Sequence, residues 1–100
     1  MKDNTLKKLS AIIRKRIIEK PEGSYVSKLL KKGKVKIANK LGEEAVETVS
    51  AFLAEEKNQI IEESADLIFH LIVLLEYSDL SFDEVIKILN KRMKDDWYTK

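Results

Sequence analysis

Apolar residues recur at intervals of three and four through nearly all of this 100-residue chain. Such spacing is typical of amphipathic helices, and no segment alternates apolar and polar residues with the period of two expected for a half-buried strand. The chain has only three Gly and one Pro, so it has few residues that break helices. We therefore predict an all-α fold: one domain over residues 1–100, built as an antiparallel bundle of about five helices.

Short polar segments mark where the predicted helices begin and end. Pro21 and Gly23 follow the first helix, and Ser24 stands where the N-cap of the second belongs. Asn58 is the expected N-cap of the fourth helix, and Ser81 begins a capping box for the fifth. The five predicted helices cover Leu6–Ile18, Tyr25–Lys32, Lys34–Glu55, the residues from the Asn58 cap to Tyr77, and Phe82–Met93.

Charge and composition exclude several classes of protein. Nineteen Lys and Arg against seventeen Asp and Glu give a net charge of +2, so we predict no nucleic-acid partner, which would require a strongly basic surface. The absence of Cys excludes a disulfide scaffold, a thiolate zinc site and a cysteine nucleophile. The longest apolar run, Leu67–Leu75, falls well short of the ~20 residues of a membrane span, and the N-terminus has no export signal. We expect no membrane association and a cytoplasmic location.

Two pairs of acidic residues lie on the third and fourth predicted helices. Glu44 and Glu47 are three residues apart, as are Glu63 and Asp66, so each pair occupies one face of its helix. Glu43 lies one turn before Glu47 on the same flank. Because only residues 48–62 separate the pairs, two antiparallel helices would bring them face to face.

The apolar surroundings of the second pair suggest a use for these acids. Apolar side chains surround most of the fourth helix, so we expect Asp66 to be buried, with His70 as a core histidine that supports the site. Buried carboxylates protonate, pair with a cation or bind a metal, and oxygen-only ligation favours Mg²⁺, with Mn²⁺ as a substitute. Such an ion could assist the attack of water on a phosphoanhydride. A non-catalytic helical assembly module, with the acids on a solvated face, is equally open from the residues alone.

Basic residues flank the acids. Lys36 and Lys40 stand four and eight residues before Glu44, which places them on one stripe that reaches the edge of the acidic site. Lys28 belongs to a lysine cluster just ahead of this stripe, and Arg92 to a cationic group near the C-terminus. We predict that these residues contact the phosphates or ribose of a ligand.

These motifs resemble a known family. Glu43, Glu44 and Glu47, followed by Glu63 and Asp66, resemble the EExxE and ExxD signature of the MazG-like, all-α nucleotide pyrophosphohydrolases. The segments 23–33, 36–47 and 62–75 narrow the resemblance to the phosphoribosyl-ATP pyrophosphatase family, over roughly residues 5–93.

The resemblance implies hydrolysis of phosphoribosyl-ATP to phosphoribosyl-AMP and pyrophosphate, the second step of histidine biosynthesis. It also implies a homodimer or a larger homo-oligomer, and a position for Glu43 beside the attacking water. A house-cleaning enzyme of the same superfamily, acting on other nucleoside triphosphates, is the alternative. The implied Mg²⁺ ligands are Glu44, Glu47, Glu63 and Asp66, and the predicted substrate contacts are Ser24, Tyr25, Lys28, Lys36, Lys40 and Arg92.

Overall fold

A computed structural model describes residues 3–95, so Trp97 and its neighbours in the segment 96–100, for which the sequence predicts no role, lie outside the described residues. The described part contains five α-helices and no strand, which confirms the all-α prediction. The helices are α1 (Thr5–Glu19), α2 (Tyr25–Lys32), α3 (Lys34–Leu53), α4 (Lys57–Tyr77) and α5 (Phe82–Lys94).

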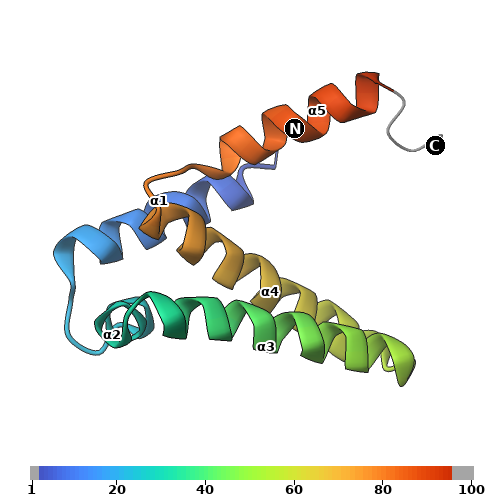
Figure 1. Cartoon of the computed structure of the whole chain (residues 1–100), viewed down its shortest axis with the longest axis horizontal. Coiled ribbons are helices and arrows are strands. Elements are labelled where there is room, and N and C mark those ends of the chain that lie inside the picture. The colour runs from blue at the N-terminus through green and yellow to red at the C-terminus, as the bar shows by residue number, and fades with distance from the viewer. Residues whose placement is uncertain (1–2, 96–100) are drawn as a thin grey trace.

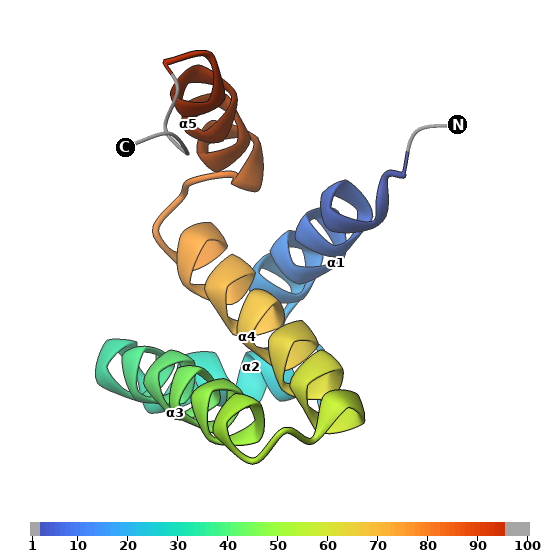
Figure 2. The ribbon, with the colours of Figure 1, turned by 90° about the vertical axis from the view of Figure 1, so that its right-hand side faces the viewer.

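The helices α3 and α4 form an antiparallel pair, and theirs is the most extensive contact between two helices in the described chain (Figure 1). The short helix α2 packs on α3 and α1, while α1 also crosses α4. Figure 2 shows α5 standing apart from α3, and α5 contacts α1. The predicted antiparallel arrangement therefore holds best for α3 and α4, the two helices that carry the acidic pairs.

The apolar core lies where α1, α2, the first half of α3 and the second half of α4 meet. Partly buried apolar residues of α1, α4 and α5, among them Leu9, Phe69 and Phe82, pack around it. One end of the α3–α4 pair, formed by the first half of α3 and the second half of α4, is therefore part of the core, and the other end lies outside it. The buried apolar residues of this cluster are Ile13, Val26, Leu29, Ile37, Ile72 and Val73.

An ion pair fixes α1 across α4. Arg14 Nε donates to Glu76 Oε1 at 2.8 Å, and Arg14 Nη2 donates to Glu76 Oε2 at 3.1 Å. The Glu76 side chain is buried, whereas Arg14 is half exposed. Both oxygens of this buried carboxylate therefore accept a hydrogen bond from the Arg14 guanidinium, which compensates for their loss of contact with water.

The helix ends follow the sequence signals with two differences. Ser24 caps α2, its Oγ accepting from the Ser27 N–H, and the Ser81 N–H donates to Glu84 Oε2 at 2.9 Å as the capping box predicts. The prediction that Asn58 is an N-cap was wrong, because α4 begins at Lys57 with Glu56 at the N-cap position and no side-chain cap. The helix α3 ends at Leu53, two residues earlier than predicted.

Gly33 alone separates α2 from α3, and its backbone has φ 94° and ψ 177°. That region is accessible almost only to glycine, so Gly33→Ala is expected to destabilise the fold by about 1 to 2 kcal/mol. The matched control is Gly42→Ala inside α3, where an added Cβ meets no atom within 4 Å and helix propensity predicts a gain of about 0.5 to 1 kcal/mol. Urea unfolding of the two variants measures both changes, and equal effects would contradict the role of Gly33.

The outer end of the α3–α4 pair exposes apolar side chains. The apolar stripe of α3 continues through Val49, Phe52 and Leu53, whose exposed fractions are 56%, 65% and 73%. Ile61 and Ile68 on α4 are also exposed, so the fourth helix is only partly buried, mainly near its C-terminal end around Ile72 and Val73. Within residues 3–95, no helix has the length and apolar content needed to span a bilayer.

Candidate active site

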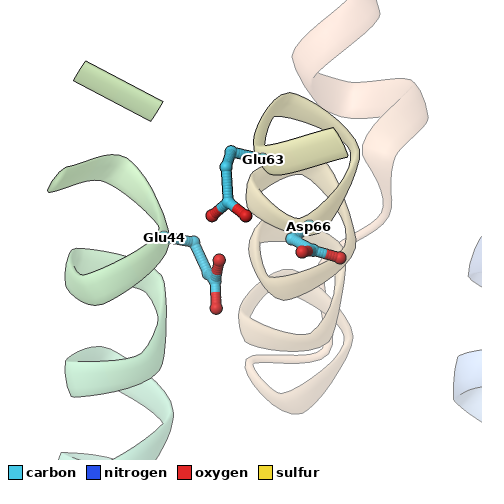
Figure 3. Close-up of side chains that lie close together, drawn as sticks. All are labelled: Glu44, Glu63 and Asp66. Carbon is cyan, nitrogen blue, oxygen red and sulfur yellow. The ribbon is translucent and has the colours of Figure 1, made fainter. Parts of the chain in front are cut away.

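Three acidic side chains from α3 and α4 converge beside the core. Glu44 reaches from α3 toward α4, where Glu63 and Asp66 are one turn apart (Figure 3). One carboxylate oxygen from each of the three residues lies within 4.8 Å of the others. We call these three residues the acidic group. The structure therefore brings together acids from both pairs, as the antiparallel arrangement predicted.

The acidic residues that are buried in the structure are not the ones that the sequence predicted to be buried. Glu44 and Glu63 are only 7% and 8% exposed, whereas Asp66 is exposed. The expectation that Asp66 is buried was wrong, because Asp66 faces outward on α4 while Glu44 and Glu63 point between the two helices. Glu44 Oε2 and Glu63 Oε2 are buried and have no hydrogen-bond partner in the described part of the chain.

Glu47, the fourth predicted ligand, lies next to Glu63 rather than within the closest set. The adjacent carboxyl group of Glu47 raises the pKa of Glu63, and burial of Glu63 raises it further. Gln59 opposes this shift, because its Nε2 donates to Glu63 Oε1 at 2.9 Å. Sequence reasoning missed Gln59, although its position one turn before Glu63 was the available signal.

The raised pKa of Glu63 makes the stability of the metal-free protein depend on pH. The folded protein holds a proton that the unfolded chain releases above the ordinary value of 4.5. The Glu63 contribution to stability is therefore favourable at low pH and is lost as pH rises through the raised pKa. Unfolding of the wild type and of Glu63→Gln in EDTA, between pH 4.5 and 7.5, should show this extra slope in the wild type only.

Glu62→Gln is the matched control for that experiment, because Glu62 is exposed on the same turn of α4. It should keep the pH slope of the wild type. If Glu63→Gln showed the same change of stability with pH as the wild type, this pH dependence could not be assigned to Glu63.

Lys40 supplies positive charge at the α3 side of the acidic group. Its Nζ lies 3.1 Å from Glu43 Oε2 and 3.8 Å from Glu44 Oε1. The hydrogen bond from Lys40 lowers the pKa of Glu43, and the charge of Lys36 lowers it further. Glu43, which is exposed, therefore stays ionised next to the acidic group, and Lys36 and Lys40 lie on the stripe that the spacing predicted.

The other predicted contact residues differ in position. The Ser24 hydroxyl is buried and serves as the cap of α2, and Lys28 is exposed on the same helix. Arg92 lies on α5, which both views show projecting away from α3, so one chain does not bring Arg92 to the acidic group (Figures 1 and 2). Arg92 is therefore the one of these three residues that lies on a helix directed away from the acidic group.

Tyr25 and His70 form a pair beside the acidic group. The Tyr25 hydroxyl oxygen lies 2.8 Å from His70 Nε2, and His70 Nδ1 lies 2.8 Å from the backbone oxygen of Asp66. Burial raises the pKa of Tyr25, while the nearby Lys40 lowers it and the carboxylate of Glu44 raises it. Because the charges of Lys40 and Glu44 both affect the pKa of Tyr25, the Tyr25 hydroxyl lies close to the acidic group.

The residues fit a hard divalent cation. Two buried carboxylate oxygens without partners, one on each helix, would be costly next to each other unless a cation or proton lies between them. Every available donor of the acidic group is a carboxylate oxygen, which suits Mg²⁺ or Mn²⁺. The ligands that would hold the ion are Glu44, Glu63 and Asp66, with Glu47 adjacent to them.

Comparison with known proteins gives one consistent result. The model of the phosphoribosyl-ATP pyrophosphohydrolase family matches residues 6–93. The chain is 52% identical to the phosphoribosyl-ATP pyrophosphatase of Metallosphaera sedula over 91% of its own length and 98% of the relative. It is 47% identical to that of Pyrobaculum neutrophilum, over 94% of this chain and 100% of the relative. The histidine biosynthesis bifunctional protein HisIE of Pyrococcus furiosus is 49% identical over 89% of this chain and 41% of its own length.

Proposed function

The chain belongs to the phosphoribosyl-ATP pyrophosphohydrolase family, and on that premise we propose that it hydrolyses phosphoribosyl-ATP to phosphoribosyl-AMP and pyrophosphate at the acidic group. This reaction is the second step of histidine biosynthesis, and we place it in the cytoplasm. The observation that carries the proposal is the meeting of Glu44, Glu63 and Asp66 oxygens within 4.8 Å, with two buried oxygens that have no hydrogen-bond partner among residues 3–95.

We propose Mg²⁺ as the resident ion, with Mn²⁺ able to replace it. When bound, the ion would neutralise charge on the phosphate oxygens and favour ionisation of water. Glu44 and Glu63 extend from opposite helices, so each helix would supply a carboxylate to the ion. Asp66, being exposed, forms the side that opens to solvent and substrate. Glu47, which lies beside Glu63, would complete the set.

The residues around the acidic group have separate tasks. Glu43 stays ionised because of Lys40, so it can accept a hydrogen bond from the attacking water and orient it. Lys36 and Lys40 provide cations for the triphosphate oxygens, and Lys28 extends this positive edge along α2. Tyr25 presents its hydroxyl to the same space, while Ser24 contributes by fixing the start of α2 that carries Tyr25.

We further propose that the chain acts as a homodimer or a larger homo-oligomer. The Cα radius of gyration is 15.3 Å, above the ~13 Å typical of a compact domain of this length. Arg92 would have to reach substrate from a second copy, given the direction of α5. The face that would be covered contains exposed apolar residues of α3 and α4, namely Val46, Val49, Phe52, Leu53, Ile61 and Ile68.

The oligomer proposal has a direct measurement. The double variant Val49→Glu with Phe52→Glu places charges on this face, where both side chains are more than half exposed in one chain. Sedimentation should show a dimer or larger species for the wild type and a monomer for the variant. A monomeric wild type would contradict the proposal.

The test of the proposed function is an assay with phosphoribosyl-ATP and Mg²⁺. The wild type should release pyrophosphate, and Glu44→Gln should not. The assay is repeated with dUTP and dCTP, because preferential cleavage of these nucleotides would assign the chain to a house-cleaning role instead. No cleavage of any nucleotide, with the fold intact, would favour a non-catalytic assembly module.

A further inference from the structure

The pairing of Tyr25 with His70 joins α2 to α4 at the edge of the acidic group. The two residues are 45 positions apart in the chain, and their rings meet edge to face with centroids 5.7 Å apart. Phe69 packs against both rings, at 6.1 Å from Tyr25 and 5.2 Å from His70. His70 is 6% exposed and Tyr25 is 44% exposed. A buried imidazole therefore holds a phenol whose other side is open to solvent.

The backbone partner of His70 determines which way this hydrogen bond runs. A backbone oxygen can only accept, so the contact between His70 Nδ1 and the Asp66 oxygen at 2.8 Å requires a proton on Nδ1. A neutral imidazole carries one N–H, so Nε2 is then an acceptor. With a neutral His70, Tyr25 donates its hydroxyl proton to Nε2, and the Tyr25 oxygen then has only lone pairs to offer on its open side.

We propose that His70 is a positioning residue: by accepting the Tyr25 hydroxyl proton at Nε2, it makes the Tyr25 oxygen a hydrogen-bond acceptor for the attacking water at the acidic group. The inference rests on the proposed function. It gives the attacking water a second hydrogen-bond acceptor, Tyr25, in addition to Glu43. A water that donates to both Tyr25 and Glu43 has its lone pair left for phosphorus.

The chemistry of the ligand supports this choice of partner. Phosphate oxygens are acceptors and would need a donor. The Tyr25 hydroxyl cannot be that donor, because its proton is already donated to His70 Nε2. Water and the Lys40 ammonium are donors, and the Lys40 ammonium already has Glu43, Glu44 and the triphosphate as partners. Tyr25 therefore suits a water better than the triphosphate.

The direction of the hydrogen bond can be measured without substrate. His70 is the single histidine of the chain, so untagged ¹⁵N-labelled protein gives one set of imidazole signals. At pH 8.5, where histidine is ordinarily neutral, we expect a pyrrole-type signal from Nδ1 and a pyridine-type signal from Nε2. Tyr25→Phe should shift the Nε2 signal, whereas the control Tyr77→Phe, on the same helix as His70, should not. A proton on Nε2 would overturn the inference.

Kinetics test the consequence for the reaction. Tyr25→Phe should lower kcat about tenfold with little change in KM, the loss of about one hydrogen bond made in the transition state. His70→Leu should cause a similar loss, while His70→Gln, whose oxygen can accept from Tyr25, should retain most of the activity. A rise in KM with kcat unchanged, or equal losses in the Leu and Gln variants, would overturn the role.

The two failures are distinguishable. A chain that is inactive toward phosphoribosyl-ATP overturns the proposed function and with it the water-orienting role, whatever the NMR shows. An active chain with the proton on Nε2 overturns the role of His70 alone.

Discussion

Replacement of Asp66 by Asn is expected to lower kcat about a thousandfold. The change keeps the shape of the side chain and removes a full negative charge from the most exposed member of the acidic group. Losing one charged ligand oxygen weakens both the hold on the ion and the electrostatic stabilisation of the transition state, and effects of ~10²–10³ are typical for such a group. Steady-state kinetics at saturating Mg²⁺ measure the loss.

The same variant should not weaken the metal-free fold. Asp66 lies among like charges, so neutralising it relieves repulsion in the absence of an ion. The melting temperature in EDTA should therefore equal or exceed that of the wild type. Asp79→Asn, an identical change in the exposed turn after α4, is the matched control and should keep full activity. A destabilised metal-free Asp66→Asn protein, or one that retains activity, would contradict the account of the acidic group.

Addition of Mg²⁺ should raise the melting temperature of the wild type by about 10 °C at an ion concentration one hundredfold above Kd. A ligand that binds only the folded state stabilises by about 2.7 kcal/mol at that concentration, and a domain of this size gains roughly 4 °C or more per kcal/mol. Glu44→Gln should lose the shift, because Glu44 is the one member of the acidic group that α3 contributes.

Glu62→Gln is the control for this titration, since Glu62 is an exposed acid next to Glu63 that lies outside the acidic group. It removes the same charge and should keep the Mg²⁺ shift. If both variants responded alike, the stabilisation would come from general screening of negative charge and not from a specific site.

The helices and the convergence of the acids could be predicted because both follow from local rules. A spacing of three residues places Glu63 and Asp66 on one face of α4. The short connection after α3 makes α3 and α4 antiparallel, and this arrangement brings Glu44 opposite Glu63 and Asp66. Family resemblance named the same residues. The geometry adds that both helices contribute to one space.

Burial could not be predicted in the same way, because it depends on how far each neighbouring helix extends. The apolar residues around Asp66 suggested a buried side chain, yet the core stops short of it, and Glu44 and Glu63 are the buried members of the acidic group. Gln59 and Tyr25 acquire their partners through side-chain geometry that periodicity does not fix. The direction of α5, which leads Arg92 away from α3, depends on the conformation of the turn after α4. The spacing of residues in the sequence does not determine that conformation.

The most direct test of the central claim is a crystal structure with Mn²⁺, located by its anomalous scattering. The account predicts an ion between α3 and α4, within ~2.3 Å of carboxylate oxygens from Glu44, Glu63 and Asp66. Glu47 should turn toward the same ion. An ion bound elsewhere, or held by acids of one helix alone, would contradict the claim that the two helices build a single metal site.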